Sequence, residues 1–583
     1  MPSIPNSIVK KQKKINILFY HGREANPGTV WLYPTVLELK TYIDLFYPSV
    51  ASELEWLVPI MHEVSDQQLI DHIQQNNVDL LCTSHYLWNH TELINQLASI
   101  KNHCNPNLKI IAGGPSIDVN ANNMFFEQHP YIDYAVYGPG EQAFADIVNH
   151  LVLNKPLIAF NTSNCGWKNH STGKTIVADY KFVKMTSTSP WLHNKKMLES
   201  MVAESKKSNK FIRIPYTLTR GCPYSCTFCD WNSGLGNKVS RRKNTYQQEI
   251  DLFHQLGINT IYLSDANVGQ YNEDVDMIEY FAQKNTKENA NFIIGGNFSK
   301  LKKENNLKIY HIMAKNSLVN KALTFSIQDP NEEVLNNIDR PDVGWDVHLN
   351  MAQELQQCYP HITIKAALIY GLPGQTPITW RQSLEQVTKQ RIFPKLFLNE
   401  PLAASPAMYD PEYQRKFQFE YIYSNRVAAG TDVLYGGSPM IYNSKIPKQC
   451  ISFSQQDLVK MTVLGAIYFA LSIVTITSYE NNGPSLDITF VVDDFLDSVY
   501  YQRLYNNLLT NWTMDNNFYY TTNFSGPTNP ISEITMGYVL FKDSLFIEYL
   551  TTFFSVKDQQ KFLELVSANK FKELIENIWT DMD

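Results

Sequence analysis

The amino-acid sequence predicts an α/β protein in three parts: a doubly wound five-stranded parallel sheet, a partial (β/α)6 TIM-like barrel and a mostly helical C-terminal region. Two observations support this prediction. Short apolar runs alternate with amphipathic helical patterns in two separate series, and the alternation breaks down after about residue 420. The chain of 583 residues is also too long for one hydrophobic core, so about three units are expected.

The first series predicts the parallel sheet, in a domain of residues 1–152. Helical patterns such as residues 91–103 separate the apolar runs, so the strands should be joined by crossovers. Ligands of such sheets bind beyond the carboxyl ends of the strands, which makes the residues after each run the candidates for binding. The expected strands are residues 15–20, 54–60, 78–84, 108–114 and 132–138.

Residues 153–210 are polar and irregular, with no sustained hydrophobic period, and we expect a linker with little structure of its own. A second alternating series then predicts a barrel domain of residues 211–405. Six βα units are enough for a partial barrel and too few for a closed eight-fold one. The expected strands are residues 212–219, 260–265, 291–296, 322–328, 362–370 and 395–399.

Residues 406–583 are expected to form a cap domain with helices at 455–470, 495–508 and 557–579. Its aromatic residues Tyr409, Tyr413 and Tyr421 suit a mid-sized organic or peptide substrate, and equally a plain hydrophobic core. The apolar stretch 461–478 is close to the length of a membrane span, but Gly465 and several hydroxyl side chains interrupt it. We therefore expect a buried helix that runs into a strand.

Composition and charge exclude several classes of protein. With 44% apolar and 18% charged residues, the chain is typical of a folded globular protein. Its net charge of -7 argues against binding to a phosphate backbone, so no nucleic-acid partner is expected. The basic run 10–14 is not followed by the apolar segment of a secretory signal, and we expect a cytoplasmic protein without a membrane partner.

Three of the eight cysteines, Cys222, Cys226 and Cys229, cluster directly after the first strand of the second series. Without a signal peptide, such a cluster indicates metal or redox chemistry rather than disulfides. Three thiols on a short loop suit a [4Fe-4S] cluster with one iron left open. Zinc is the alternative, but structural zinc takes four ligands and no fourth Cys or His lies nearby at a suitable spacing. The isolated cysteines, expected to be small apolar residues, are Cys82, Cys104, Cys165, Cys358 and Cys450.

The CxxxCxxC loop, with Phe228 just before its last cysteine, resembles the signature of the radical S-adenosylmethionine (SAM) superfamily. The resemblance implies that the open iron chelates the amino and carboxylate groups of SAM. It also implies that an electron from an external flavodoxin- or ferredoxin-type donor cleaves SAM to methionine and a 5′-deoxyadenosyl radical.

Polar residues and glycines also end the later strands of the second series, and such groups suit a hydroxyl-rich, anion-bearing nucleoside. In proteins similar to this one, these strand ends contact the amino group, ribose and adenine of SAM, and an arginine after the fourth strand meets its carboxylate. The residues that the resemblance assigns to SAM are Phe228, Asp265, Asn297, Ser326, Gln328, Arg340 and Tyr370.

In the N-terminal domain, the segments after the third, fourth and fifth strands are rich in glycine, which lets the backbone approach a bulky ligand. A Rossmann nucleotide site is disfavoured because the turn after the first strand, Tyr20-His-Gly-Arg-Glu, lacks G-x-G-x-x-G. Ahead of a radical SAM core, this domain resembles the cobalamin-binding domain of class B radical SAM methylases. The residues that this resemblance assigns to cobalamin are Ser84, Tyr86, Trp88, Asn89, Gly113, Gly114, Pro115, Gly138 and Glu141.

The Asp-x-His-x-x-Gly signature that supplies a histidine ligand to cobalt is absent. The resemblance then implies cobalamin held without a protein imidazole, with Trp88 against the lower face of the corrin. His85 and His90 leave a coordinating alternative open.

Together the resemblances imply a cobalamin-dependent radical SAM methyltransferase that acts on an unactivated carbon of a small-molecule or peptide substrate. The radical abstracts hydrogen, methylcobalamin donates the methyl group and a second SAM remethylates the cobalamin. One alternative uses the same cofactors for cyclisation or rearrangement. Another is a non-catalytic iron-sulfur or cobalamin sensor.

Overall fold

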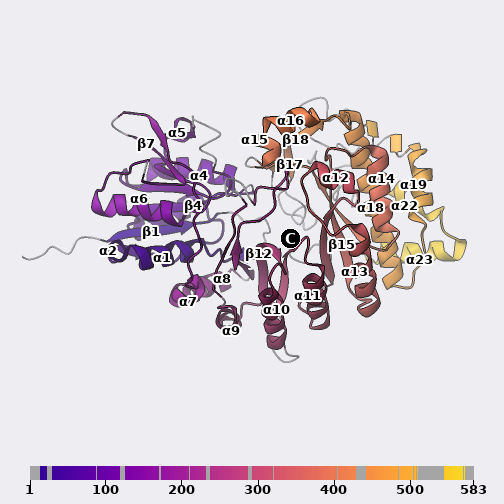
Figure 1. Cartoon of the computed structure of the whole chain (residues 1–583), viewed down its shortest axis with the longest axis horizontal. Coiled ribbons are helices and arrows are strands. Elements are labelled where there is room, and N and C mark those ends of the chain that lie inside the picture. Colours follow the sequence, from indigo (N-terminus) through magenta and orange to yellow (C-terminus); the bar gives the residue numbers. More distant parts are fainter. Residues whose placement is uncertain are drawn as a thin grey trace, which may run out of the picture. The chain divides into compact units, whose positions relative to one another are not determined.

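The computed structural model describes much of the chain. The chain splits into two compact units, Met1–Ile212 and Arg213–Asp583. Figure 1 draws the first unit in indigo to purple and the second in magenta to yellow. The described residues are 14–22, 29–86, 88–117, 125–159, 161–169, 172–208, 210–231, 237–243, 245–285, 292–319, 321–402, 405–427, 441–483, 485–499, 501–502, 505–506, 509, 544–568 and 570.

The first unit is built on one sheet with the strand order β3-β1-β4-β5-β6-β7-β8. The first five strands in this order pair in parallel and the last two are antiparallel. A parallel sheet in an α/β fold is as predicted, but two further strands extend it. The strands are β1 (Ile15–Tyr20), β3 (Leu54–Trp56), β4 (Leu80–Ser84), β5 (Lys109–Gly113), β6 (Tyr134–Val136), β7 (Cys165–Lys168) and β8 (Thr175–Val177), and a short β2 (Thr29–Trp31) stands apart from them.

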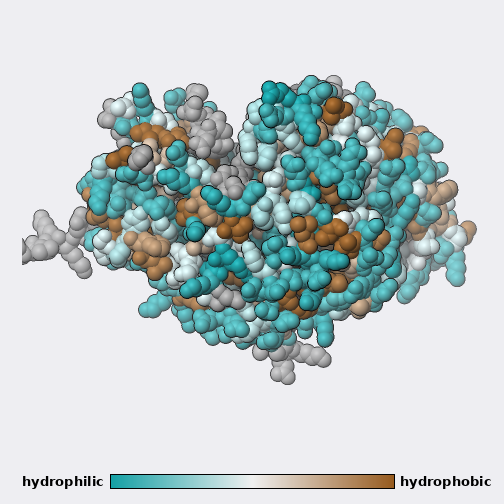
Figure 2. Space-filling model, in the orientation of Figure 1, coloured by the Kyte–Doolittle hydropathy of each residue, from teal (hydrophilic) through white to brown (hydrophobic). Residues whose placement is uncertain are grey.

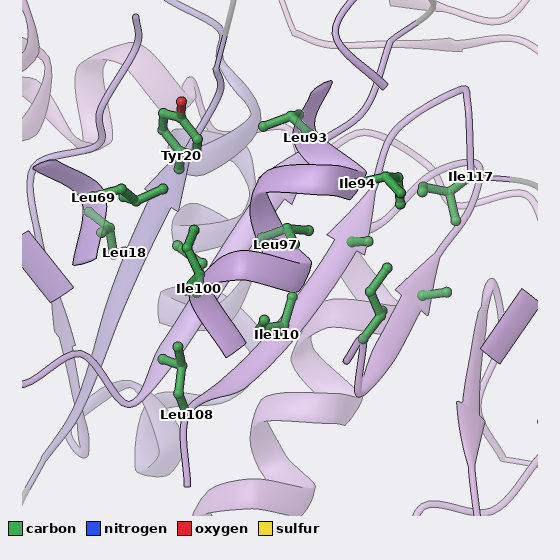
Figure 3. Packing of buried hydrophobic residues seen from close by; sticks show 14 of the residues in the cluster. Leu18, Tyr20, Leu69, Leu93, Ile94, Leu97, Ile100, Leu108, Ile110 and Ile117 are labelled. Carbon is green, nitrogen blue, oxygen red and sulfur yellow. The ribbon is translucent and has the colours of Figure 1, made fainter. Parts of the chain in front are cut away.

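Helices cover both faces of this sheet, so its central strands are buried on both sides. These strands therefore appear in the sequence as apolar runs. One face carries α3 and α4, and the other carries α1 and α6. In α4, Leu93, Ile94, Leu97 and Ile100 form a helical stripe in the same buried cluster as Ile110 of β5, and Leu97 and Ile100 lie beside Ile110 (Figure 3). The helices are α1 (Thr35–Phe46), α2 (Pro48–Ala51), α3 (Asp66–Gln75), α4 (His90–His103), α5 (Phe125–Gln128), α6 (Glu141–Leu153), α7 (Pro190–His193) and α8 (Lys195–Lys206).

Residues 153–210, expected to be a linker with little structure of their own, have more regular structure than predicted. This segment contributes β7, β8, α7 and α8, and it belongs to the first unit. Tyr134 of β6 pairs with Trp167 of β7, and Cys165 and Trp167 are buried in the core beneath. Strands of three or four residues are too short to show a period, which is why the sequence pattern missed them.

The second unit contains six parallel strands in two hydrogen-bonded groups of three, β13-β12-β9 and β14-β15-β16. The Ile294 amide of β13 donates to the Leu318 carbonyl just before β14, at 2.7 Å. The strands are β9 (Phe211–Tyr216), β12 (Thr260–Val268), β13 (Ile293–Phe298), β14 (Ala322–Gln328), β15 (Thr363–Tyr370) and β16 (Phe393–Leu398).

Helices follow the first five of these strands, so the chain repeats a βα unit. A short hairpin, β10 (Thr219–Arg220) and β11 (Ser240–Arg241), interrupts the first repeat. The helices are α9 (Tyr246–Leu256), α10 (Asn272–Lys284), α11 (Lys303–Lys315), α12 (Glu332–Asn337), α13 (Trp345–Cys358) and α14 (Pro377–Thr388).

The C-terminal part of this unit adds an antiparallel hairpin to its helices, so it is less purely helical than predicted. The hairpin pairs β17 (Glu420–Val427) with β18 (Ile441–Gln449). Parts of the predicted helices at 495–508 and 557–579 lie outside the described residues, and α23 covers the first half of the second one. The helices are α15 (Pro406–Tyr409), α16 (Pro411–Phe417), α18 (Gln455–Glu480), α19 (Ile488–Leu496), α22 (Ser544–Thr551) and α23 (Val556–Ser567).

The apolar stretch 461–478 lies within α18, a single helix, and the predicted passage into a strand is wrong. Its β-branched run from Ile473 to Thr477 favours a strand by propensity, but burial in the core overrides propensity. Trp380 of α14 donates its indole N–H to the Met461 carbonyl at 3.0 Å. Within the described residues α18 alone is long and apolar enough to cross a membrane by length and composition, and 83% of its most apolar window is buried.

The face drawn in Figure 2 is mostly hydrophilic, and its apolar residues lie in small separate groups. The large apolar side chains are instead concentrated in the cores described above. This distribution follows from the favourable free energy of removing apolar surface from water.

Candidate functional site

The loop that carries Cys222, Cys226 and Cys229 starts at the end of β9 and is closed at its base by the β10–β11 hairpin. Gly221 opens the loop with φ of +89°, and a Cβ atom there would collide with the carbonyl oxygen of Lys238. Only glycine fits this turn without displacing the backbone. The local sequence therefore brings the three cysteines to the carboxyl end of the first strand, as expected.

Contacts from distant segments hold the middle of the loop. The Thr227 amide donates to the Ile338 carbonyl at 3.0 Å, and the Ala407 amide donates to the Thr227 carbonyl at 2.8 Å. The Thr227 hydroxyl donates to the Tyr413 hydroxyl at 2.9 Å. Phe228, assigned to SAM by resemblance, packs against the buried cluster of Val334, Leu335, Ile338 and Leu372.

Two arginines hold the returning arm of the loop. Arg241 donates to Asp274 at 2.7 Å and to the Thr219 hydroxyl at 2.8 Å. Arg242 lies 3.3 Å from Glu249, which also accepts the Tyr216 hydroxyl. The side chains of Arg242 and Glu249 are 2% and 0% exposed, so this ion pair is fully desolvated. The pair ties the loop to α9.

The thiols lie in a buried polar setting. Cys222 and Cys226 are buried and Cys229 is half-buried. Asn267 of β12 donates to the Cys222 sulfur at 3.2 Å, and the Lys300 ammonium lies 3.9 Å from the same sulfur. Burial raises the pKa of the Cys229 thiol to about 12, so a metal that binds there displaces a proton.

The donor set of this loop fits an iron-sulfur cluster: three thiols, with N–H groups and a positive charge beside one of them. Across the described ranges, no three His, Cys, Asp or Glu side chains are grouped as they would be around one metal ion. The three cysteines therefore do not form a compact single-ion site. The cluster assignment stays a prediction from the loop and its surroundings.

The residues assigned to SAM fall into different surroundings. Asp265 accepts the Leu218 amide at 2.8 Å, so it braces the start of the cysteine loop, and burial raises its pKa to about 6. Asn297 donates to the Tyr262 hydroxyl at 3.4 Å. Tyr370 is fully buried with its ring 5.7 Å from that of Trp380, which places its side chain in the core.

Ser326 and Arg340 lie together at the end of β14. Arg340 donates to the Ser326 carbonyl and lies 3.7 Å from Asp342, which accepts a hydrogen bond from His348 at 2.8 Å. Both residues line a small cavity that Lys300 also borders. Gln328 closes β14 with φ of +65°, and its buried amide oxygen has no hydrogen-bond partner.

The loop after β15, which contains the Gly371 turn, is fixed by Asp329. This carboxylate accepts from the Gln375 amide at 2.6 Å and from the Ser383 hydroxyl at 2.8 Å. Burial raises its pKa from 3.8 to about 6. The network links the ends of β14 and β15, two of the strand ends that the resemblance assigns to SAM.

Asp329 is expected to make stability depend on pH. Because its pKa is higher in the folded chain, the folded state binds more protons between about pH 4 and pH 6, and stability falls as the pH rises through this window. The expected loss is about 3 kcal/mol relative to Asp329→Asn, which does not titrate. Denaturant unfolding of both proteins at several pH values measures the difference, and parallel profiles would contradict it.

In the first unit, the loops after β4 and β5 pack backbone to backbone. The His85 amide donates to the Gly113 carbonyl at 2.7 Å, and the Ser116 amide donates to the His85 carbonyl at 3.1 Å. Gly114 has φ of +103°, and a Cβ atom there would lie 2.5 Å from the His85 oxygen. The predicted cobalamin residues Ser84, Gly113 and Gly114 are thereby brought together.

Asn89 organises the loop after β4. Its amide donates to the carbonyls of His21 and Ser84 at 2.8 and 3.1 Å, and its oxygen accepts the Tyr86 amide at 2.7 Å. Tyr86 and Trp88 stack with ring centroids 4.7 Å apart, and the Trp88 indole N–H is buried without a hydrogen-bond partner. A buried N–H without a partner, in a loop at the carboxyl end of a parallel strand, suits hydrogen bonding to a polar group of a bound ligand.

The two histidines of this loop have different surroundings. His85 is fully buried and its Nε2 lies 2.9 Å from the Thr83 hydroxyl. Burial lowers the pKa of His90 to about 4, so its imidazole is neutral at physiological pH. Gly138 is exposed, with φ of +62° beneath the Tyr180 ring, and Pro115 is also exposed, whereas Glu141 is buried at the start of α6.

Some residues near these loops were missed by sequence reasoning. His21 follows β1 directly, stacks 3.7 Å from the Tyr33 ring and shares a small pocket with Ser84. Its position after the first strand was the available signal. Lys300 was not singled out because the strand predicted at residues 291–296 ends earlier than β13, which runs to Phe298.

Two family models match the chain. The model for the radical SAM superfamily matches residues 216–387, and the model for the B12 binding domain matches residues 58–148. The first range contains the cysteine loop and β12 to β15, and the second contains the loops after β4, β5 and β6.

Two curated relatives are similar to more than half of the chain. The cobalamin-dependent radical SAM methyltransferase TokK of Streptomyces tokunonensis is 27% identical over 341 residues, which cover 58% of this chain and 48% of the relative. The 2-(S-pantetheinyl)-carbapenam-3-carboxylate methyltransferase of Streptantibioticus cattleyicolor is 26% identical over 358 residues, 59% of this chain and 50% of the relative. The chain thus spans about half the length of these relatives.

Among solved structures, the fold resembles that of the cobalamin-dependent S-adenosylmethionine radical enzyme OxsB with aqua-cobalamin and S-adenosylmethionine bound. The TM-score is 0.58 at 12% identity, over 98% of this chain and 81% of that one. At this identity the likeness shows a shared fold.

Proposed function

Because the chain belongs to the cobalamin-binding radical SAM enzymes, we propose that it is a cobalamin-dependent methyltransferase acting on an unactivated carbon of a small-molecule or peptide substrate. One observation carries the proposal: a single chain joins a B12 binding domain to a three-cysteine loop at the end of a strand in a radical SAM domain. The two relatives above, both named as methyltransferases, support methyl transfer.

In this proposal Cys222, Cys226 and Cys229 hold the [4Fe-4S] cluster. When bound, the cluster and SAM supply a 5′-deoxyadenosyl radical, and cobalamin supplies the methyl group. The protein's share is to bind these groups in one orientation and to keep water away from them. We also propose an external electron donor of the flavodoxin or ferredoxin type and a cytoplasmic location.

The chain's own residues support a SAM site at the strand ends of the second unit. The polar groups of Asn297, Ser326 and Gln328 end β13 and β14, and the Arg340 guanidinium lies against Ser326. We keep Arg340 as the proposed partner of the SAM carboxylate. Asp265, Phe228 and Tyr370 make their contacts within the protein, so a positioning role suits them better than direct contact.

For cobalamin, the packed loops of the first unit supply the proposed site. Ser84, Gly113 and Gly114 form a close backbone junction, and Tyr86 and Trp88 offer a stacked aromatic surface beside it. The full burial of His85 makes it a poor cobalt ligand, so we propose binding without a protein imidazole and with Trp88 facing the corrin.

A variant at Gly114 tests this site. Gly114→Val forces a side chain into a backbone with φ of +103° and against His85, so the two loops must separate. We expect the affinity for hydroxocobalamin to fall at least about tenfold, measured by absorbance after gel filtration. Gly173→Val is the control, since its φ of +68° is also positive but nothing lies within 4 Å of a Cβ atom there. Equal affinity in both variants would contradict the assignment.

The methyl-transfer half of the proposal is tested without the substrate. The chain is loaded anaerobically with iron, sulfide and cobalamin, reduced, and given SAM. We expect S-adenosylhomocysteine in an amount close to that of the bound cobalamin. A cyclase or rearrangement enzyme with the same cofactors would yield deoxyadenosine without S-adenosylhomocysteine, and a sensor would yield neither.

A further inference from the structure

Side-chain N–H groups from two different segments lie against the sulfur of Cys222. Asn267, near the end of β12, donates to it at 3.2 Å, and Lys300, just after β13, places its ammonium 3.9 Å away. Cys222 and Asn267 are 4% and 8% exposed, so little water competes for the thiol. This arrangement is distinct from the residues that the sequence assigned to SAM.

The two donors also support one another. The Lys300 ammonium lies 3.3 Å from the Asn267 amide oxygen, which orients the amide so that its N–H points at the sulfur. The same ammonium lies 4.8 Å from the ring centroid of Tyr224, two residues after Cys222. Lys300, Asn267, Cys222 and Tyr224 therefore form one connected group in which a positive charge faces the cysteine loop.

We propose that Asn267 and Lys300 are positioning residues that raise the reduction potential of the cluster held by Cys222. The inference rests on the proposed function. Reduction adds one electron from the external donor to the cluster and changes no covalent bond. N–H groups and a positive charge beside a ligating sulfur stabilise the added negative charge, as hydrogen bonds around iron-sulfur clusters do.

The experiment is an anaerobic redox titration of the reconstituted full-length chain, followed by electron paramagnetic resonance, without SAM or cobalamin. Asn267→Leu removes the amide donor at similar size, and Lys300→Met removes the charge but keeps most of the stem. Both variants should bind iron as the unmodified chain does and reduce at a more negative midpoint potential. Lys300→Arg keeps the charge and should restore most of the shift.

Lys389→Met is the matched control. It removes the same charge from an exposed lysine that pairs with Glu385 of α14, and it should leave the midpoint potential unchanged. If Asn267→Leu fails to hold iron, the midpoint potential of Lys300→Met still tests the inference. A midpoint potential equal to that of the unmodified chain in Lys300→Met, at equal iron content, overturns the inference and leaves the proposed function standing. If the unmodified chain binds no cluster at all, the proposed function itself fails.

Discussion

Replacing Cys226 by alanine is expected to abolish the iron-sulfur cluster and to lower the formation of deoxyadenosine from SAM by more than about 100-fold. In the proposed cluster, Cys222, Cys226 and Cys229 each bind one iron, and the fourth iron has no protein ligand. Without Cys226, a second iron would also lack a thiolate. Iron and sulfide per chain after anaerobic reconstitution, and deoxyadenosine by liquid chromatography, measure the two effects.

Cys358→Ala is the control for this variant, because Cys358 is an exposed free cysteine on α13. It should change neither iron content nor deoxyadenosine formation. The iron-free Cys226→Ala chain should unfold within about 1 kcal/mol of the iron-free unmodified chain, since the substitution removes only one buried sulfur atom. A Cys226→Ala variant with full iron content and activity would remove Cys226 from the cluster.

The second large effect is expected at the buried ion pair behind the cysteine loop. Arg242→Met leaves the Glu249 carboxylate without its cation in a fully buried site, and removing one partner of such a pair costs about 3 to 5 kcal/mol. The free energy of unfolding from denaturant titration measures this loss. Because Arg242 lies on the returning arm of the loop, bound iron should also be lost faster to a chelator.

Arg381→Met provides the comparison, since Arg381 pairs with Asp493 and Glu385 at a partly exposed site and should cost at most about 1 kcal/mol. The double variant Arg242→Met with Glu249→Leu should recover part of the lost stability, because it removes both charges. If Arg242→Met is no more costly than Arg381→Met, the ion pair does not support the loop.

Local patterns predicted the features that depend on neighbouring residues. The cysteine spacing and the glycine before it lie within one short loop, so the sequence placed the three thiols at the end of β9. The apolar runs of β1, β4 and β5 were readable because both faces of those strands are buried. In the same way, the stripe on α4 follows the helical period.

Contacts between distant residues could not be read from the sequence. Asn267 and Lys300 lie 45 and 78 residues from Cys222, and only the parallel packing of β9, β12 and β13 brings them together. Asp265 was expected at the end of its strand, but β12 continues to Val268 and the Asp265 carboxylate accepts the Leu218 amide. The strand expected after residue 470 failed for a related reason, because burial of that part of α18 in the core overrides its strand propensity.

The proposed radical cleavage of SAM by this chain is tested by measuring the deoxyadenosine that it forms. The anaerobically reconstituted chain, with about four irons bound, is incubated with SAM and a strong reductant, and deoxyadenosine is quantified over time. We expect deoxyadenosine to form only when the reductant is present and when Cys222, Cys226 and Cys229 are all intact. No deoxyadenosine from a chain that holds its cluster would contradict it.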